Sequence, residues 1–348
     1  MIFRNLLALA LFSSALGAQT PPRFEVDPTW PKPLPEGWVW GRLGGVCVDS
    51  HDHIAVADRR DITEEEAETS QAAPPIVVFD AEGNVIRTMG EPDTVPQSIH
   101  GCTFDGEDNI WVAGNGDGII QKYSHDGKLL MQIGKRGRYD TSDGTRQGTR
   151  NNSARDQFYL PSAVAIDPEN GDIYVSDGYG NRRVAVFDKT GKFLRQWGRQ
   201  ATGEEVRAGA PGAFAQLVHC IAMSNEGLIY VCDRQGDRVQ VFEKSGKFVR
   251  NIWIRTGTPG LPDPRGTVWW VAFSRDPEQK FLYVMNGRNE QVHILDHKSG
   301  KIISSFGRPG HQIGNFIHGH AVALDSKGNL YVAETDWGRR VQKFRPKE

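Results

Sequence analysis

The sequence predicts an all-β fold, a six-bladed β-propeller built from one repeated unit. Three observations support this prediction. Units of about 40 to 60 residues recur in tandem, each with four short strands. Turn dipeptides such as DG, EG, SG and KG separate those strands, whose residues alternate or are wholly apolar. The 39 Gly and 19 Pro among 348 residues suit a β-rich chain with many turns.

Six repeats follow a Pro-rich entry segment. Their first strands begin near Gly44, His100, Leu160, His219, Val268 and His320. The sixth repeat stops one strand short of the pattern. The segment from Phe24 to Trp30 is expected to supply that strand, because a ring closed in this way leaves no open sheet edge. The NHL-type propeller would then be a single domain from residue 24 to residue 346.

The first residues have the composition of a secretory signal peptide. Arg4 precedes an apolar run from Leu6 to Leu16, and small residues follow at Gly17 and Ala18. The run is too short to span a bilayer, so we expect cleavage near residue 18 and no membrane span in the mature chain. The protein is therefore predicted to be exported, either to a periplasm or as a secreted protein, and to be a monomer.

The net charge bears on binding to nucleic acid and membranes, and the spacing of the cysteines bears on disulfide formation. With 41 basic and 43 acidic residues, the net charge of −2 predicts no general affinity for nucleic acid or for membrane surfaces. The four cysteines show no C-x-x-C spacing. Cys47 with Cys102, and Cys220 with Cys232, occupy positions that would allow disulfides after export, whereas buried free thiols are the alternative.

Three histidines recur at one position of the repeat. Each opens a first strand, and an aromatic residue of the second strand follows 11 residues later: Trp111 after His100, Tyr230 after His219, and Tyr331 after His320. First strands line the central channel of a propeller, and alternate blades of a six-fold ring lie about 120° apart. Equivalent side chains in blades 2, 4 and 6 therefore converge on the axis.

Three imidazoles that meet at one point, with an open coordination position, are how proteins hold catalytic zinc. Other divalent metals also accept imidazole ligands. We expect His318, two residues before His320, to lie beside this site. The remaining histidines are expected in turns or outer strands on the surface: His51, His53, His125, His293, His297 and His311.

Loops after the second strands are predicted to lie at the channel mouth. They carry Arg59, Arg60, Tyr179, Arg234, Asn286 and Arg288. Arginines there would attract an anionic substrate and grip a carboxylate, and a tyrosine beside a metal could act as a general base. Two longer loops, residues 61–75 and 134–157, are either solvated surface or rims that shape a substrate mouth.

The motifs carry a family likeness. FDKTGKFLRQWG in the third repeat and GNLYVAE in the sixth resemble NHL repeats. SDGYGNRRVAVF, the openings HGCTFD, HCIAMS and HAVALD, and VCDRQGDRVQVF together resemble the peptidyl-α-hydroxyglycine α-amidating lyase family. The likeness extends over essentially all of the predicted mature chain.

The resemblance implies roles for particular residues. His100, His219 and His320 would bind zinc, and Tyr179 of the SDGY motif would be the base that takes a proton from the substrate hydroxyl. Arg59 and Arg234 would hold the substrate carboxylate and support the tyrosinate. The implied reaction breaks the C–N bond of an α-hydroxy-amide to give an amide and glyoxylate, with zinc as a Lewis acid.

Two departures from the family pattern bear on the expected cofactors and cysteines. The family also implies a calcium ion near the channel, held by backbone carbonyls that would map to Val46 and Cys102 and by an acid after the last zinc ligand. Ala321 stands where that acid is expected, which argues against calcium. Gly180 stands where the family has a cysteine, so disulfides of the animal enzymes are not expected.

Two other functional classes compete with a lyase. A non-catalytic NHL propeller would bind a protein or a glycan, with its histidines holding a structural metal or none. A hydrolase of the lactonase type is also six-bladed, but its site is built on calcium with acidic and Asn ligands, which the three histidines do not match. The sequence therefore favours a zinc-dependent lyase for a small or peptide substrate that carries a carboxylate.

Overall fold

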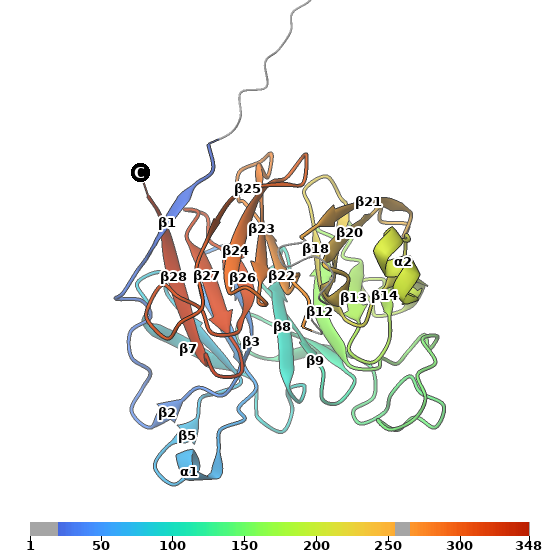
Figure 1. Cartoon of the computed structure of the whole chain (residues 1–348). Coiled ribbons are helices and arrows are strands. Elements are labelled where there is room, and N and C mark those ends of the chain that lie inside the picture. Colours follow the sequence, from blue (N-terminus) through green and yellow to red (C-terminus); the bar gives the residue numbers. More distant parts are fainter. Residues whose placement is uncertain (1–19, 255–264, 348) are drawn as a thin grey trace, which may run out of the picture.

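Six four-stranded antiparallel sheets form the ring of a β-propeller in this computed structural model, which describes residues 20–254 and 265–347 (Figure 1). The predicted six-bladed fold is confirmed. The predicted signal peptide, residues 1–18, lies outside the described residues. Within the described ranges, no helix combines the length and the apolar character needed to cross a membrane.

The strands of each blade follow one another in sequence from the channel outward. Blade 1 has β3 (Leu43–Val48), β4 (Ile54–Asp58), β6 (Ile76–Phe79) and β7 (Val85–Met89). Blade 2 has β8 (Ile99–Phe104), β9 (Ile110–Gly114), β10 (Ile120–Tyr123) and β11 (Leu129–Ile133). Blade 3 has β12 (Pro161–Ile166), β13 (Ile173–Asp177), β14 (Arg183–Phe187) and β15 (Phe193–Trp197). Blade 4 has β18 (Val218–Met223), β19 (Ile229–Asp233), β20 (Arg238–Phe242) and β21 (Phe248–Trp253). Blade 5 has β22 (Trp270–Phe273), β23 (Phe281–Asn286), β24 (Gln291–Asp296) and β25 (Lys301–Phe306).

Blade 6 is completed by the other end of the chain, as the sequence predicts. It contains β26 (Gly319–Leu324), β27 (Leu330–Glu334) and β28 (Arg340–Lys347), and its outer strand is β1 (Arg23–Val26). Figure 1 shows β1 in blue beside β28 in red, and the two strands pair in antiparallel register. Trp30, which follows β1, is buried between the rings of Phe79 in blade 1 and Tyr331 in blade 6.

Short elements decorate the loops between blades. The acidic loop of residues 61–75 contains α1 (Glu64–Ala67) and β5 (Gln71–Ala72), which pairs with β2 (Trp38–Val39). The loop between blades 3 and 4 contains β16 (Arg199–Gln200), α2 (Gly203–Ala208) and β17 (Ala213–Phe214). Both helices start at a threonine whose side chain caps the first turn.

Burial decreases from the channel to the outer rim. The second strands β4, β9, β13 and β19 are buried at every residue. Fourth strands such as β7 and β25 expose alternate or most residues, because they have a neighbouring sheet only along part of their surface. This pattern fixes the register of the inner strands, since a one-residue shift would turn their apolar side chains away from the neighbouring blades.

A buried acid at the end of the second strand anchors the residues that precede the first strand. Four backbone N–H groups are held in this way: Gly41 by Asp58 at 3.1 Å, Tyr159 by Asp177 at 2.9 Å, Ala215 by Asp233 at 2.8 Å, and Ile317 by Glu334 at 2.7 Å. In three blades the acid also pairs with an arginine of the third strand: Arg183, Arg238 and Arg340. We call this arrangement of acid, backbone N–H and, where present, arginine the clamp. It fixes the start of the first strand, and first strands carry the residues that face the channel.

Two histidines that the sequence analysis placed on the surface are buried. His293 lies in β24 with 2% of its area exposed, and its Nε2 lies 3.0 Å from Nδ2 of Asn286. Nε2 of His297 lies 2.7 Å from the hydroxyl oxygen of Tyr230 in blade 4, and the two groups share a hydrogen bond. The surface prediction was wrong because β24 is a third strand with a buried interior, and because Tyr230 of blade 4 packs against His297.

The clamp in blade 4 should contribute strongly to stability. Asp233 and Arg238 are both fully buried, and the carboxylate oxygen lies 2.8 Å from Nε of the arginine. Changing Asp233 to Asn leaves the guanidinium charge buried without its counter-ion, so we expect the free energy of unfolding to fall by about 3–5 kcal/mol. Urea unfolding followed by circular dichroism would measure the change.

Glu243→Gln in the same blade is the matched control for Asp233→Asn. Glu243 pairs with Lys247 at 2.9 Å on the surface, where an ion pair contributes about 0–1 kcal/mol. Equal losses of stability in the two variants would show that the buried clamp has no special role.

Candidate active site

The structure brings His100, His219 and His320 together at the centre of the ring. Each is the second residue of its first strand, in β8, β18 and β26, and all three are buried. The ring centroid of His100 lies 4.6 Å from that of His219 and 4.6 Å from that of His320. Their ligand nitrogens lie within 4.8 Å of one another, so the three imidazoles can share one ion.

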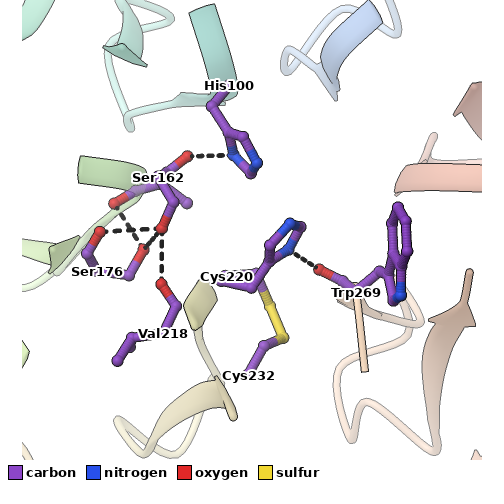
Figure 2. The surroundings of a disulfide bond; sticks show 9 residues. His100, Ser162, Ser176, Val218, Cys220, Cys232 and Trp269 are labelled. Carbon is purple, nitrogen blue, oxygen red and sulfur yellow. Dashed lines mark hydrogen bonds between the residues drawn. A yellow bond between two sulfur atoms is a disulfide. The ribbon is translucent and has the colours of Figure 1, made fainter. Parts of the chain in front are cut away.

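Backbone carbonyls of the next blade orient these rings. Nδ1 of His100 lies 2.9 Å from the carbonyl oxygen of Ser162 in blade 3 (Figure 2), and Nδ1 of His219 lies 2.6 Å from that of Trp269 in blade 5. Gly44 of blade 1 occupies the equivalent position beside His320, and its backbone carbonyl raises the pKa of that ring. Nδ1 of His320 nevertheless makes no hydrogen bond of good geometry among the described residues. A Cβ atom at Gly44 would lie 1.8 Å from the carbonyl oxygen of Ile99, so this close approach of blades requires glycine.

The donor set fits a cation. A neutral imidazole that donates through Nδ1 keeps a lone pair on Nε2. Nε2 of His320 lies 3.2 Å from Nε2 of His100, and the Tyr179 hydroxyl contacts Nε2 of both His100 and His219. One hydroxyl proton can serve only one of these acceptors. The three Nε2 lone pairs therefore outnumber the protons available to them. A zinc-class ion bound at this point would accept all three lone pairs.

Electrostatics keep the three rings neutral. Burial lowers the pKa of each of the three imidazoles well below its ordinary value. Arg59 lowers the pKa of His100 and His320 further, and Arg234 lowers the pKa of all three. Because metals bind the neutral imidazole, the site is ready to accept an ion without first losing protons.

Tyr179 reaches the histidines from the loop that follows β13. Its hydroxyl oxygen lies 2.9 Å from Nε2 of His100 and 3.1 Å from Nε2 of His219. Arg182 holds this turn, since its Nη1 donates to the carbonyl oxygens of Gly178 and Gly180, each at 3.0 Å. The tyrosine hydroxyl is thus fixed where a group bound at the three histidines could exchange a proton with it.

Arg59 and Arg234 supply positive charge on the same side of the site. Burial lowers the pKa of both guanidinium groups, and the nearby Tyr179 acts in the opposite direction. Nε of Arg59 is buried and has no hydrogen-bond partner among the described residues. Arg234 lies over the Trp269 ring, 3.6 Å from its centroid, and its Nε donates to the carbonyl oxygen of Arg265 at 2.6 Å. In the described ranges neither arginine makes an ion pair with a carboxylate, so both can bind an anion.

Three other candidates from the sequence have different surroundings. Arg60 turns away, and its Nε donates to the carbonyl oxygen of Ala73 at 3.0 Å. Asn286 is buried and bonds within blade 5 to Asn289 and His293. His318 lies near the site as expected, with Nδ1 3.5 Å from a carboxylate oxygen of Asp336.

Two residues beside the site were not identified from the sequence, the aromatic Trp270 and the acidic Asp336. The Trp270 ring centroid lies 6.3 Å from that of His100 and 6.0 Å from that of His320, so its indole forms one wall of the site. The negative charge of Asp336 raises the pKa of both Arg59 and Arg234. A signal was present in the sequence, because VWWVAF places Trp269 at the blade 5 position that corresponds to the histidines and Trp270 directly after it.

Beyond Trp270 the channel opens into a cavity of about 330 Å³ on the far side of the ring. Val46 and Cys102, whose carbonyls the resemblance assigns to calcium, line it together with Trp270. Ala321 is fully buried and carries no carboxylate. Calcium at this place stays a prediction of the resemblance alone.

Both cysteine pairs are disulfides. Cys47 and Cys102 join the first strands of blades 1 and 2, and Cys220 and Cys232 join the first two strands of blade 4 (Figure 2). The alternative of free thiols is therefore wrong. Each disulfide lies near a channel histidine, since Cys102 follows His100 by two residues and Cys220 follows His219 directly.

Comparisons with known proteins find an NHL repeat in this chain and several proteins of similar sequence. The NHL repeat model matches residues 158–187, which include β12 to β14 of blade 3. Peptidyl-glycine alpha-amidating monooxygenase B of Xenopus laevis is 26% identical over 328 residues, which cover 88% of this chain and 34% of that protein. The probable peptidyl-alpha-hydroxyglycine alpha-amidating lyase pgal-1 of Caenorhabditis elegans is 24% identical, with 87% of this chain and 82% of that protein covered. The chain is therefore similar over most of its length to proteins named as alpha-amidating enzymes, at low identity.

The similarity has limits that bear on function. The chain spans about a third of the length of the Xenopus monooxygenase that it matches. NHL repeat-containing protein 3 of Homo sapiens is also similar, at 25% identity over 93% of this chain and 84% of that protein. A solved streptogramin B lyase shares the fold, with a TM-score of 0.57 over 93% of this chain and 98% of that chain, but at 12% identity it shows the fold alone.

The metal content of the purified protein tests the histidine site. We expect His219→Ala to hold about one zinc ion fewer per chain than the wild type, because two imidazoles hold zinc far more weakly than three. Elemental analysis after dialysis would measure it, with His311→Ala as a control, since His311 is exposed. A folded wild type that takes up no ion when zinc is offered would contradict a metal site at these histidines.

Proposed function

We propose that this protein is a metal-dependent carbon–nitrogen lyase that cleaves an α-hydroxy-amide resembling peptidyl-α-hydroxyglycine into an amide and glyoxylate. The observation that carries the proposal is the placement of Tyr179, whose hydroxyl contacts Nε2 of two of the three converging histidines. Arg59 and Arg234, which form no ion pair with a carboxylate among the described residues, both lie close to Tyr179. Relatives named as amidating lyases support the same reaction class.

The reaction needs a proton to move and nothing to be oxidised. The substrate hydroxyl loses its proton, its oxygen becomes the aldehyde oxygen of glyoxylate, the C–N bond breaks, and the amide nitrogen gains a proton. Zinc bound by His100, His219 and His320 would supply Lewis acidity for the hydroxyl oxygen. Tyr179 is placed to take the hydroxyl proton, and the same proton can pass to the departing nitrogen, so the overall change balances.

The arginines orient the substrate through its carboxylate. The buried Nε of Arg59 has no hydrogen-bond partner in the described part of the chain, and Arg234 is held in place by Trp269 and by the Arg265 carbonyl. A guanidinium group fits a carboxylate with two parallel hydrogen bonds, which fixes direction as well as position. Trp270 lies beside His100 and also lines the cavity beyond it, so its indole would limit access of water from that side.

Export is part of the proposal. The N-terminal sequence has the composition of a signal peptide, and the disulfides Cys47–Cys102 and Cys220–Cys232 are of the kind that persists in oxidising compartments. We therefore place the working protein in a periplasm or outside the cell.

Changing Tyr179 to Phe removes only the hydroxyl. We expect metal content to remain, while kcat for glyoxylate release from an α-hydroxyglycine compound falls about 10²- to 10⁴-fold, the usual contribution of a general base. Turnover by Tyr179→Phe at the wild-type rate would exclude the tyrosine as base. A wild type that binds zinc yet releases no glyoxylate would instead favour a propeller that binds a partner without catalysis.

Changing Arg234 to Ala should act mainly on substrate binding. Loss of a hydrogen-bonded charge contact with the carboxylate predicts a rise in KM of about 10- to 100-fold. Arg60→Ala is the matched control, because this neighbouring arginine bonds to the Ala73 carbonyl instead. Steady-state kinetics on both variants would separate them, and similar KM values in both would remove Arg234 from the carboxylate site.

A further inference from the structure

A second cluster of metal-ligating side chains lies outside the candidate active site, in turns of blades 1 and 2. Asp49 and His53 belong to the turn between β3 and β4, and His125 belongs to the turn between β10 and β11. One ligand atom from each of these three residues lies within 4.8 Å of the others. None of the three takes part in the proposed lyase reaction.

Asp49 is the fixed centre of this cluster. Its side chain is buried, and its Oδ1 accepts hydrogen bonds from the backbone N–H groups of His51 at 2.9 Å and His53 at 2.8 Å. Its Oδ2 lies 2.9 Å from Nδ1 of His53 and 4.0 Å from Nε2 of His125. The fold therefore points one carboxylate oxygen at two imidazoles from two different blades.

The separations suit a coordinated ion. Ligand atoms in a tetrahedral zinc site, with bonds of about 2.0–2.2 Å, lie about 3.4 Å apart. Oδ2 of Asp49 lies 2.9 Å from Nδ1 of His53 and 4.0 Å from Nε2 of His125, one value below and one above that separation. Because His125 is exposed, its ring can move by the small amount required. Two imidazoles and one carboxylate are a ligand set that zinc, nickel and copper accept.

A fourth ligand is within reach. The His51 ring stacks on that of His53, with centroids 5.8 Å apart and an interplanar angle of 16°, and its centroid lies 6.5 Å from that of His125. Nδ1 of His51 lies 3.3 Å from a carboxylate oxygen of Asp108 in blade 2. That carboxylate adds negative charge on the same side of the cluster.

One cation opposes an incoming ion. Nη1 of Arg87 lies 3.2 Å from Nδ1 and 3.1 Å from Nε2 of His125. A metal bound at His125 must displace the guanidinium from one of these nitrogens. Asp49 and Asp108 together carry more charge than Arg87, so the net field at the cluster still favours a cation.

We propose that Asp49, His53 and His125 form a second site for a divalent ion of the zinc class, with His51 available as a further ligand. The site ties the inner turn of blade 1 to the outer turn of blade 2. The Cys47–Cys102 disulfide joins the same two blades near the channel. Ion binding at the turns would therefore stabilise this interface further from the axis, because ligands from two blades must stay together for the ion to remain bound.

Zinc titration of the wild type and of the double variant His53→Ala/His125→Ala tests the proposal. Both proteins are stripped with a chelator, and calorimetry counts the bound ions. The wild type is expected to bind one more zinc ion than the double variant, and the exposed single variant His311→Ala is expected to match the wild type. Because the readout is a difference, it does not depend on whether the channel histidines hold an ion.

A melting measurement provides the second readout. In the His219→Ala background, zinc should raise the melting temperature, and adding His53→Ala and His125→Ala should abolish that rise. Equal zinc stoichiometry in the wild type and the double variant would overturn the proposal. A zinc-dependent rise that persists without His53 and His125 would overturn it as well.

Discussion

The backbone carbonyl that the next blade places beside each channel histidine is the feature on which the candidate site depends. Ser162 orients His100, and Trp269 orients His219. The corresponding neighbour of His320 is Gly44, which belongs to the first blade. The site therefore needs a closed ring, and closure needs β1 to pair with β28. The histidines of blades 2, 4 and 6 meet at the axis, and blades 1, 3 and 5 between them supply the carbonyls that lie beside the rings.

Much of the fold follows from the sequence, because a propeller repeats its local rules. The constant spacing of 11 residues from histidine to aromatic residue identified equivalent first strands in three blades. Equivalent positions in alternate blades must face the axis, so the convergence of His100, His219 and His320 was a geometric consequence. The strand supplied by the N-terminal segment also followed, since a sixth blade one strand short leaves an open edge.

The contacts between blades were harder to predict, because they depend on packing between residues far apart in sequence. Trp270 faces the histidines because its strand leads directly into the channel, yet a tryptophan in an apolar run is usually read as core. His297 looked like a surface residue, but it is buried and contacts Tyr230 of the neighbouring blade. The cluster at Asp49 joins a turn of blade 1 to a turn of blade 2, and no repeat pattern relates those positions.

Charge explains why the candidate site should bind a metal and an anion together. The three imidazoles are held neutral by burial and by the nearby guanidinium groups, so positive charge at the centre is disfavoured unless ligand bonds compensate for it. In the proposed complex, a divalent ion adds to the repulsion that Arg59 and Arg234 already exert. A substrate carboxylate between these arginines would relieve that repulsion. The ion and the anion would then each bind more tightly in the presence of the other, since coupling between two sites is reciprocal. Such a site would select substrates that present a hydroxyl and a carboxylate on adjacent atoms, because only these satisfy both charges at once.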